Sequence, residues 1–175
     1  AIPVLYVSHS PDEVARLADH LVLLEQGRVL ASGPTAELLS RLDLPLALDE
    51  DAAVLVDTTV ASHDEAFALT RLVFAGGSIQ VTRKALPEGA RARLKIQARD
   101  VSIALRGDNL SSIVNRLPAR IVGFGAAAHP AQCLVRLDVA GTPLLARITH
   151  LSREQLGLAE GMEVVAQIKS VALLG

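Results

Sequence analysis

Hydrophobic positions along this chain follow two patterns, and the change between them falls near residue 53. Residues 2–8 form a continuous apolar run, which is typical of a strand covered on both faces. A Ser-Pro-Asp-Glu sequence at 10–13 follows at once. Its serine fits a helix N-cap, its proline fits the first helical position, and its acidic pair suits the positive helix end. The pattern predicts a strand of the type that is buried on both faces, but poorly covered in this chain, followed by a helix over 11–19.

The next elements are shorter and are separated by turn residues. Two apolar runs within 21–32 flank Gln26-Gly27, which predicts a hairpin. Residues 34–39 have the pattern of a short closing helix. Two breaks and an acidic cluster then occupy 43–52, which indicates a boundary. We therefore divide the chain into an N-terminal α/β unit at 1–43, a linker at 44–52 that holds Asp49, Glu50 and Asp51, and a β-domain at 53–175.

After residue 53, strands of five to eight residues alternate with turns that contain glycine, the pattern of a small barrel or sandwich. This region contains a weak internal echo. Residues 75–82 resemble 140–149, and Leu-Pro-Glu-Gly at 86–89 resembles Leu-Ala-Glu-Gly at 158–161. The order and spacing predict two related β-units, while chance similarity in a Val/Ala/Leu-rich chain is the alternative.

Composition narrows the possible functions. The chain is 50% hydrophobic but only 2% aromatic, with a net charge of -2, so a base-stacking surface and a nucleic-acid partner are disfavoured. A single cysteine, Cys133, excludes an internal disulfide and favours a reducing compartment. The apolar runs are shorter than a membrane span, and no signal segment opens the chain. We expect a soluble, intracellular protein in which Cys133 is a core or strand residue.

His9 stands between the predicted strand and helix, where an anion would be welcome. A site that cleaves phosphate also needs a Gly-rich loop with Lys and Ser/Thr, and carboxylates for magnesium. No G-x-x-x-x-G-K-[ST] sequence occurs in the chain. His9 therefore cannot catalyse with this chain alone. His63, His129 and His150 show no metal-ligand spacing, so we expect no metal site.

The stretch "VLYVSHSPDEVARLADHLVLLEQGRVLASGPTAELL" closely resembles the end of the nucleotide-binding domain of importer-type ABC ATPases. The resemblance implies that His9 is the switch histidine, which contacts the γ-phosphate of ATP in that family. It also implies that the Walker A loop, signature motif and Walker B carboxylates lie upstream of residue 1. On this interpretation the chain is a C-terminal fragment without ATPase activity, and its full-length parent is an ATPase that uses ATP and magnesium.

The later sequence resembles the regulatory domain of molybdate-importer ATPases, which contains a molybdate-binding Mop or TOBE-type module. The resemblance covers roughly 53–175, with the Mop-like module at about 111–175, and its most specific piece is "GLAEGMEVVAQIKS". It implies a mainly β, OB-like regulatory barrel that binds molybdate or tungstate. The implied ligand residues are Ser112, Thr149, Ser152, Lys169 and Ser170, shared between the subunits of a homodimer.

One position departs from the family pattern. Where the family often has Ser-x-Arg-Asn, this chain has Ser112-Ile113-Val114-Asn115, so one guanidinium is missing. We expect Arg116 to replace it only through a change of strand register. Weak oxyanion binding, or none, is one expected consequence.

Two hypotheses follow from these observations. The first is a fragment of a molybdate importer's ATP-binding subunit, peripheral on the inner face of the cell membrane and partnered by a transmembrane permease. The second is a standalone intracellular store or sensor of molybdate. The ATPase-like stretch favours the first, since a storage protein has no use for it.

Overall fold

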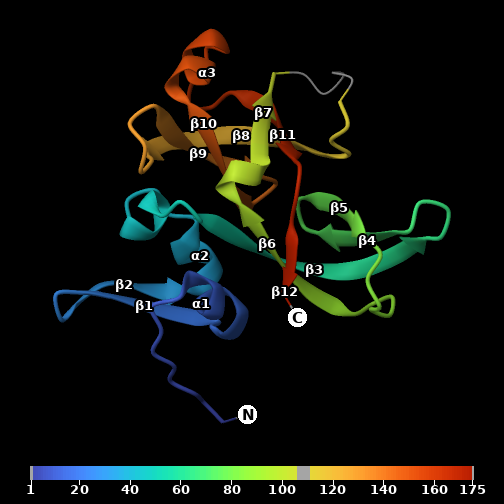
Figure 1. The fold of residues 1–175 in the computed structure, drawn as a ribbon, viewed down its shortest axis with the longest axis horizontal. Coiled ribbons are helices and arrows are strands. Elements are labelled where there is room, and N and C mark those ends of the chain that lie inside the picture. The colour runs from blue at the N-terminus through green and yellow to red at the C-terminus, as the bar shows by residue number, and fades with distance from the viewer. Residues whose placement is uncertain (1, 106–110, 175) are drawn as a thin grey trace.

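The computed structural model describes residues 2–105 and 111–174. Most of these residues lie in β-strands, as expected. A small N-terminal unit sits beside two five-stranded sheets (Figure 1). The N-terminal unit consists of helix α1 (Pro11–Leu17), the hairpin β1 (His20–Glu25) and β2 (Arg28–Pro34), and helix α2 (Thr35–Leu39).

The predicted helix and hairpin both form. Ser10 is the N-cap of α1, and its hydroxyl accepts a hydrogen bond from the Glu13 backbone N–H at 3.4 Å. The helix ends at Leu17, earlier than the predicted end at residue 19. At the hairpin turn, Gln26 and Gly27 both have positive φ, 49° and 75°, which matches the right-handed twist of the paired strands.

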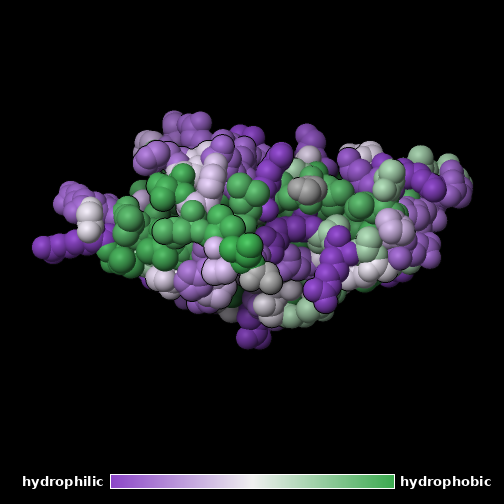
Figure 2. All heavy atoms as spheres, turned by 90° about the horizontal axis from the view of Figure 1, so that it is seen from below, coloured by the Kyte–Doolittle hydropathy of each residue, from purple (hydrophilic) through white to green (hydrophobic). Residues whose placement is uncertain are grey.

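The strand predicted at residues 2–8 does not form, and the segment is poorly covered, as expected. The segment is irregular, and Leu5, for example, is 93% exposed. A strand needs a paired neighbour for its backbone groups, and the segment pairs with no strand in the part of the chain that the structure describes. Together with apolar side chains of α1 and the hairpin, it leaves an exposed hydrophobic surface, visible as the large green area of Figure 2. Its large exposed members are Ile2, Val4, Leu5, Tyr6, Val7, Leu17, Val22, Leu24, Val29 and Leu30.

The β-domain contains two sheets. The first has the strand order β12-β6-β3-β4-β5, and the second has the order β10-β9-β8-β11-β7. The strands of the first sheet are β3 (Ala53–Asp64), β4 (Leu69–Phe74), β5 (Gly77–Thr82), β6 (Arg91–Gln97) and β12 (Ala172–Leu174). Those of the second are β7 (Val101–Ala104), β8 (Asn115–Ala126), β9 (Gln132–Val139), β10 (Thr142–Thr149) and β11 (Glu163–Ile168). Short helices complete the chain: η1 (Pro45–Leu48), η2 (Ala98–Asp100) and α3 (His150–Gln155).

The two sheets repeat one topology, which confirms the echo in the sequence. The strands β3 to β6 pair with one another as β8 to β11 do. Each first strand also carries an irregularity at the same place, between Val60 and Ser62 in β3 and between Ile121 and Gly123 in β8. Such bulges bend a strand sharply, so both sheets curl in the same way.

The last strand of each unit is exchanged. Strand β7 follows β6 in the chain but pairs with β11 of the second sheet. Strand β12 follows β11 but pairs with β6 of the first sheet. In Figure 1 the red C-terminal segment accordingly descends from the second sheet to the first.

The two sheets share one hydrophobic core. From the first sheet, β3 and β6 contribute Val54, Leu94 and Ile96. From the second sheet, β9 and β10 contribute Leu134 and Leu144. All five side chains are fully buried. Aliphatic residues form nearly all of this core, in keeping with the 2% aromatic content. The shared core and the exchanged strands hold the two units together as one body.

Candidate functional site

Thr149 and Ser152 form a compact pair at the end of β10. Thr149 is the N-cap of α3, and its Oγ1 accepts a hydrogen bond from the Ser152 backbone N–H at 3.0 Å. The two hydroxyl oxygens lie 2.8 Å apart, so one hydroxyl donates to the other. That leaves one hydroxyl hydrogen of the pair for a ligand oxygen.

Lys169, Ser170 and Ser112 gather at the other end of the sheet. Strand β11 ends at Ile168, which is paired with Asn115 at the start of β8. Lys169 and Ser170 follow this pair directly, and Ser112 lies three residues before it; all three are exposed. One exposed ammonium and two exposed hydroxyls at the same end of a sheet are a suitable donor set for an oxyanion.

The strand register separates these two groups. Thr149 pairs with Gln132 of β9, and the next residue of β9, Cys133, pairs with Ala126 at the end of β8. The Thr149–Ser152 pair therefore lies beyond the end of β8, whereas the Lys169 group lies at its beginning. Among the described residues no hydrogen bond joins the two groups. The five predicted ligand residues thus form two half-sets in one chain.

Asn115 has a structural role that the sequence did not reveal. Its side-chain Nδ2 donates to the Gln80 carbonyl at 2.9 Å, and its Oδ1 accepts from the Gln80 N–H at 2.7 Å. Gln80 lies on β5, the edge strand of the first sheet. The buried amide therefore pairs with the edge as a strand backbone would, and it links the two sheets.

The Arg116 guanidinium lies against the segment that contains Ser112. Its Nε donates to the Ile113 carbonyl at 3.0 Å, and its Nη2 donates to the Ser111 carbonyl at 3.3 Å. The expectation that Arg116 replaces the missing guanidinium only through a change of strand register stays a prediction. Val114 itself is 68% exposed.

His9 is exposed and directly precedes the N-cap of α1. The start of this helix is held by Glu13, whose carboxylate accepts hydrogen bonds from Ser8 Oγ at 2.5 Å and Tyr6 Oη at 3.1 Å. These two hydrogen bonds lower the pKa of the Glu13 carboxyl below its ordinary value, and the bond from Ser8 has the larger effect. His9 is therefore presented on the surface of an ordered helix start.

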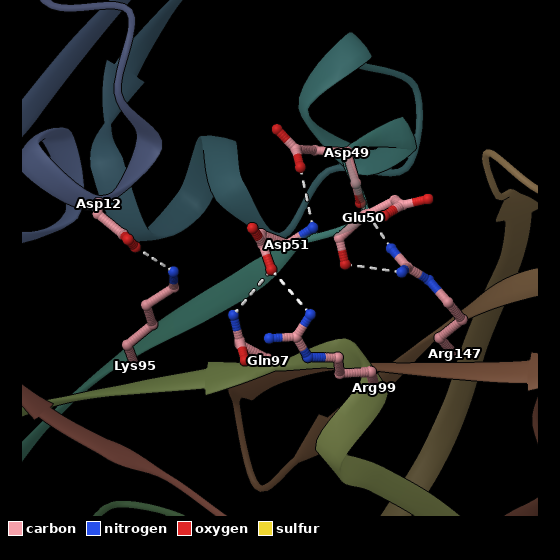
Figure 3. Close-up of polar contacts among 8 residues, drawn as sticks. All are labelled: Asp12, Asp49, Glu50, Asp51, Lys95, Gln97, Arg99 and Arg147. Atoms are coloured by element: carbon pink, nitrogen blue, oxygen red, sulfur yellow. Dashed lines mark hydrogen bonds and ion pairs between the residues drawn. The ribbon is translucent and has the colours of Figure 1, made fainter.

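Two basic side chains of β6 hold α1 against the first sheet. Lys95, only 7% exposed, forms an ion pair with Asp12 in the first turn of α1 (Figure 3). The hydrogen bond and the charge of Lys95 lower the pKa of the Asp12 carboxyl. Arg93, two positions earlier on the same face, pairs with Asp19 just after the helix at 3.3 Å and with Asp57 at 2.8 Å. The helix that follows His9 is thus tied to the β-domain at both ends.

The second half of the chain matches a known domain family. A family model described as "TOBE domain" matches residues 111–174. The chain is also 59% identical over 173 residues to "Molybdenum import ATP-binding protein ModC" of Aromatoleum aromaticum, covering 99% of this chain and 46% of that protein. A ModC protein of Pseudomonas aeruginosa is 59% identical over 175 residues, covering 99% and 48%. Residues 111–174 thus match the TOBE domain family, and almost the whole chain is similar to ModC proteins.

The chain spans about half the length of these ModC relatives. Its fold is also found in a solved structure, the cytoplasmic molybdate-binding protein ModG with molybdate bound. The two superpose with a TM-score of 0.59 at 22% identity, covering 68% of this chain and 93% of that chain. This likeness, together with the strand content, confirms the predicted mainly β, OB-like class.

Burial raises the pKa of the Cys133 thiol, as expected for an inert core residue on β9. Within residues 2–105 and 111–174, no group of His, Cys, Asp or Glu side chains is arranged to hold a metal ion. In the same ranges no helix has the length and apolarity needed to cross a membrane.

Proposed function

We propose that this chain is the C-terminal regulatory part of the ATP-binding subunit of a molybdate importer. The observation that carries the proposal is 59% identity to two ModC proteins along 99% of the chain. In this proposal the subunit lies in the cytoplasm on the inner face of the membrane, where it is partnered by a transmembrane permease.

Residues 1–43 would complete the nucleotide-binding domain of the whole subunit, with ATP and magnesium bound by its other motifs and His9 as the switch histidine. The exposed hydrophobic surface of this unit supports the idea, because large apolar patches mark interaction surfaces. The chain alone should release no phosphate from ATP. Magnesium-dependent release above a heat-denatured control would contradict this.

The oxyanion would bind between two copies of the chain. Within one copy the Thr149–Ser152 pair and the Lys169 group lie at opposite ends of β8, so a second copy is needed to bring complementary halves together. We therefore expect a homodimer in sedimentation experiments. A monomer at tens of micromolar would contradict the shared site.

The half-sets suit a tetrahedral dianion such as molybdate or tungstate. Lys169 would supply one positive charge, and Ser112, Thr149, Ser152 and Ser170 would supply neutral donors. Charge-assisted contacts are the strong ones in such a site, so the lysine should dominate the binding free energy.

Calorimetric titration tests this assignment. Molybdate and tungstate should bind, while the smaller sulfate should bind more weakly. Lys169→Ala should abolish measurable binding, whereas Lys84→Ala, which removes an exposed lysine of the other β-unit, should leave it unchanged. Unchanged molybdate binding in Lys169→Ala would show that the site is elsewhere.

The second candidate is a standalone molybdate store or sensor, favoured by the structural likeness to ModG. The ordered attachment of residues 10–19 to β6 argues against it, because a storage module needs no such unit. Binding of the chain to the transmembrane permease of a molybdate importer in pull-down experiments would support the importer, and its absence would favour the store.

A further inference from the structure

The linker between the N-terminal unit and the β-domain is held by an arginine of the second β-unit. The Arg147 guanidinium donates to the Glu50 carbonyl at 2.7 Å and to the Asp49 carbonyl at 2.6 Å (Figure 3). Two charge-assisted bonds to consecutive carbonyls fix the path of the backbone more firmly than a single exposed ion pair would. The sequence had indicated only an acidic linker.

The next linker residue is held from the end of β6. The Asp51 carboxylate accepts a hydrogen bond from Gln97 Nε2 at 3.2 Å and forms an ion pair with Arg99 at 3.0 Å. Its backbone N–H donates to the Asp49 carboxylate at 2.8 Å, which closes a tight turn. Residues 49–51, which we call the joint, are therefore held by side chains from both β-units.

Arg147 and Arg99, which hold the joint, both lie close to proposed oxyanion residues. Arg147 lies two positions before Thr149 on the same strand, β10. Arg99 is followed by Asp100, whose carbonyl accepts the Lys169 backbone N–H at 2.9 Å. A displacement of either half-set on ligand binding would therefore move Arg147 or Arg99, and with them the joint.

The joint is also linked through β6 to α1, the helix that follows His9. Gln97, which holds Asp51, lies two positions after Lys95 on β6, and Lys95 pairs with Asp12 of α1. A pocket lies between these parts and is lined by Pro11 and Ala15 of α1, by Asp49 and Asp51 of the joint, and by Lys95. Side chains of α1, of the joint and of β6 therefore face one space.

We propose that the joint at residues 49–51 couples the second β-unit to helix α1, with Arg147 as its positioning residue. Coupling between two sites requires an element whose contacts both sites influence, and the joint has that position. What the joint transmits, namely the occupancy of the oxyanion half-sets, rests on the proposed function. The mechanical coupling itself does not.

Hydrogen–deuterium exchange on the ligand-free chain tests the coupling. Arg147→Met should speed exchange of the amides of residues 12–18, by roughly tenfold for the loss of a charge-assisted contact. Arg120→Met is the matched control, because Arg120 lies on the same sheet but pairs with the exposed Glu163. Asp51→Asn, which keeps the side-chain size, should act in the same direction as Arg147→Met.

Two results of this comparison would overturn the coupling. One is equal exchange of residues 12–18 in Arg147→Met and Arg120→Met. The other is an equal rise in Arg147→Met at the buried strand β9, which would mean general destabilisation rather than coupling.

Adding sodium molybdate tests what the joint transmits. In the unmodified chain, saturating molybdate should change exchange at residues 12–18, and Arg147→Met should lose this response. Calorimetric binding without any response in the unmodified chain would overturn transmission through the joint. Absence of calorimetric binding would refute the proposed function instead, while the ligand-free comparison would still decide the coupling.

Discussion

Gly89 and Gly161 occupy equivalent positions in the two β-units and adopt the same left-handed conformation, with φ of +82° in each. Each donates its N–H to the residue that precedes the irregularity of its sheet, Gly89 to the Val60 carbonyl and Gly161 to the Ile121 carbonyl, both at 2.8 Å. The two units therefore share both the order of their strands and the backbone hydrogen bonds of this turn.

Replacing either glycine by alanine should cost about 1 kcal/mol of unfolding free energy, because left-handed φ is unfavourable for a residue with a Cβ. No atom lies within 4 Å of the added Cβ at either site, so steric clash adds nothing. The two costs should be additive in urea denaturation. Gly33→Ala is the control, since its φ is ordinary and its Cβ would meet only Leu38, at 3.7 Å. Equal effects at all three positions would contradict the explanation.

Asn115→Ala should destabilise the chain by roughly 2 kcal/mol, because it leaves the Gln80 N–H and carbonyl without their side-chain partner. Asn115→Asp should also destabilise, since a carboxylate can accept from the N–H but cannot donate to the carbonyl. The neighbouring exposed Val114→Ala should change the denaturation midpoint little. A stable Asn115→Ala variant would mean that water replaces the amide without cost.

Val114→Arg should strengthen molybdate binding by roughly tenfold to a hundredfold in calorimetric titrations, since it adds a charge-assisted contact beside Ser112. Arg116→Met should weaken binding if its guanidinium, which lies against the same segment, contributes charge to the site. Val114→Lys supplies the charge without the planar fork and should give a smaller gain. No gain from either substitution would show that position 114 does not face the ligand.

The Asp12–Lys95 pair should make stability depend on pH. The folded pKa of Asp12 is lowered from its ordinary value of 3.8, so the pairing stabilises the fold above that value. This stabilisation is lost as the pH falls below 3.8 through the lowered pKa. Asp12→Asn should destabilise by up to about 1 kcal/mol at pH 7 and flatten the acid limb of the stability curve. Glu88→Gln, at an exposed carboxylate in the loop between β5 and β6, should leave that limb unchanged.

Local patterns predicted the local elements. The cap at Ser10 and the turn at Gln26-Gly27 depend on neighbouring residues, so the sequence contained the necessary information. The internal echo also predicted the repeated unit, because turn glycines such as Gly161 keep their spacing within each unit.

Long-range contacts could not be predicted in this way. Residues 2–8 read as a buried strand because composition reports how apolar a segment is, and not whether a neighbouring strand is present. The pairing of Asn115 with Gln80 and the grip of Arg147 on the linker join positions at least 35 residues apart. One signal was available in the sequence. The basic side chains that alternate along β6, such as Arg93 and Lys95, indicate a polar face that can contact another element.

The exchange of β7 and β12 has a consequence for how the chain folds. Two separate single-unit chains that traded their last strands in this manner would form a dimer whose stability depended on protein concentration. Here both units belong to one polypeptide, so each strand meets its partner at an effective concentration set by the connecting segments. The exchange of strands within one chain therefore adds no dependence of stability on protein concentration, and neither unit can be excised without removing a strand from the other.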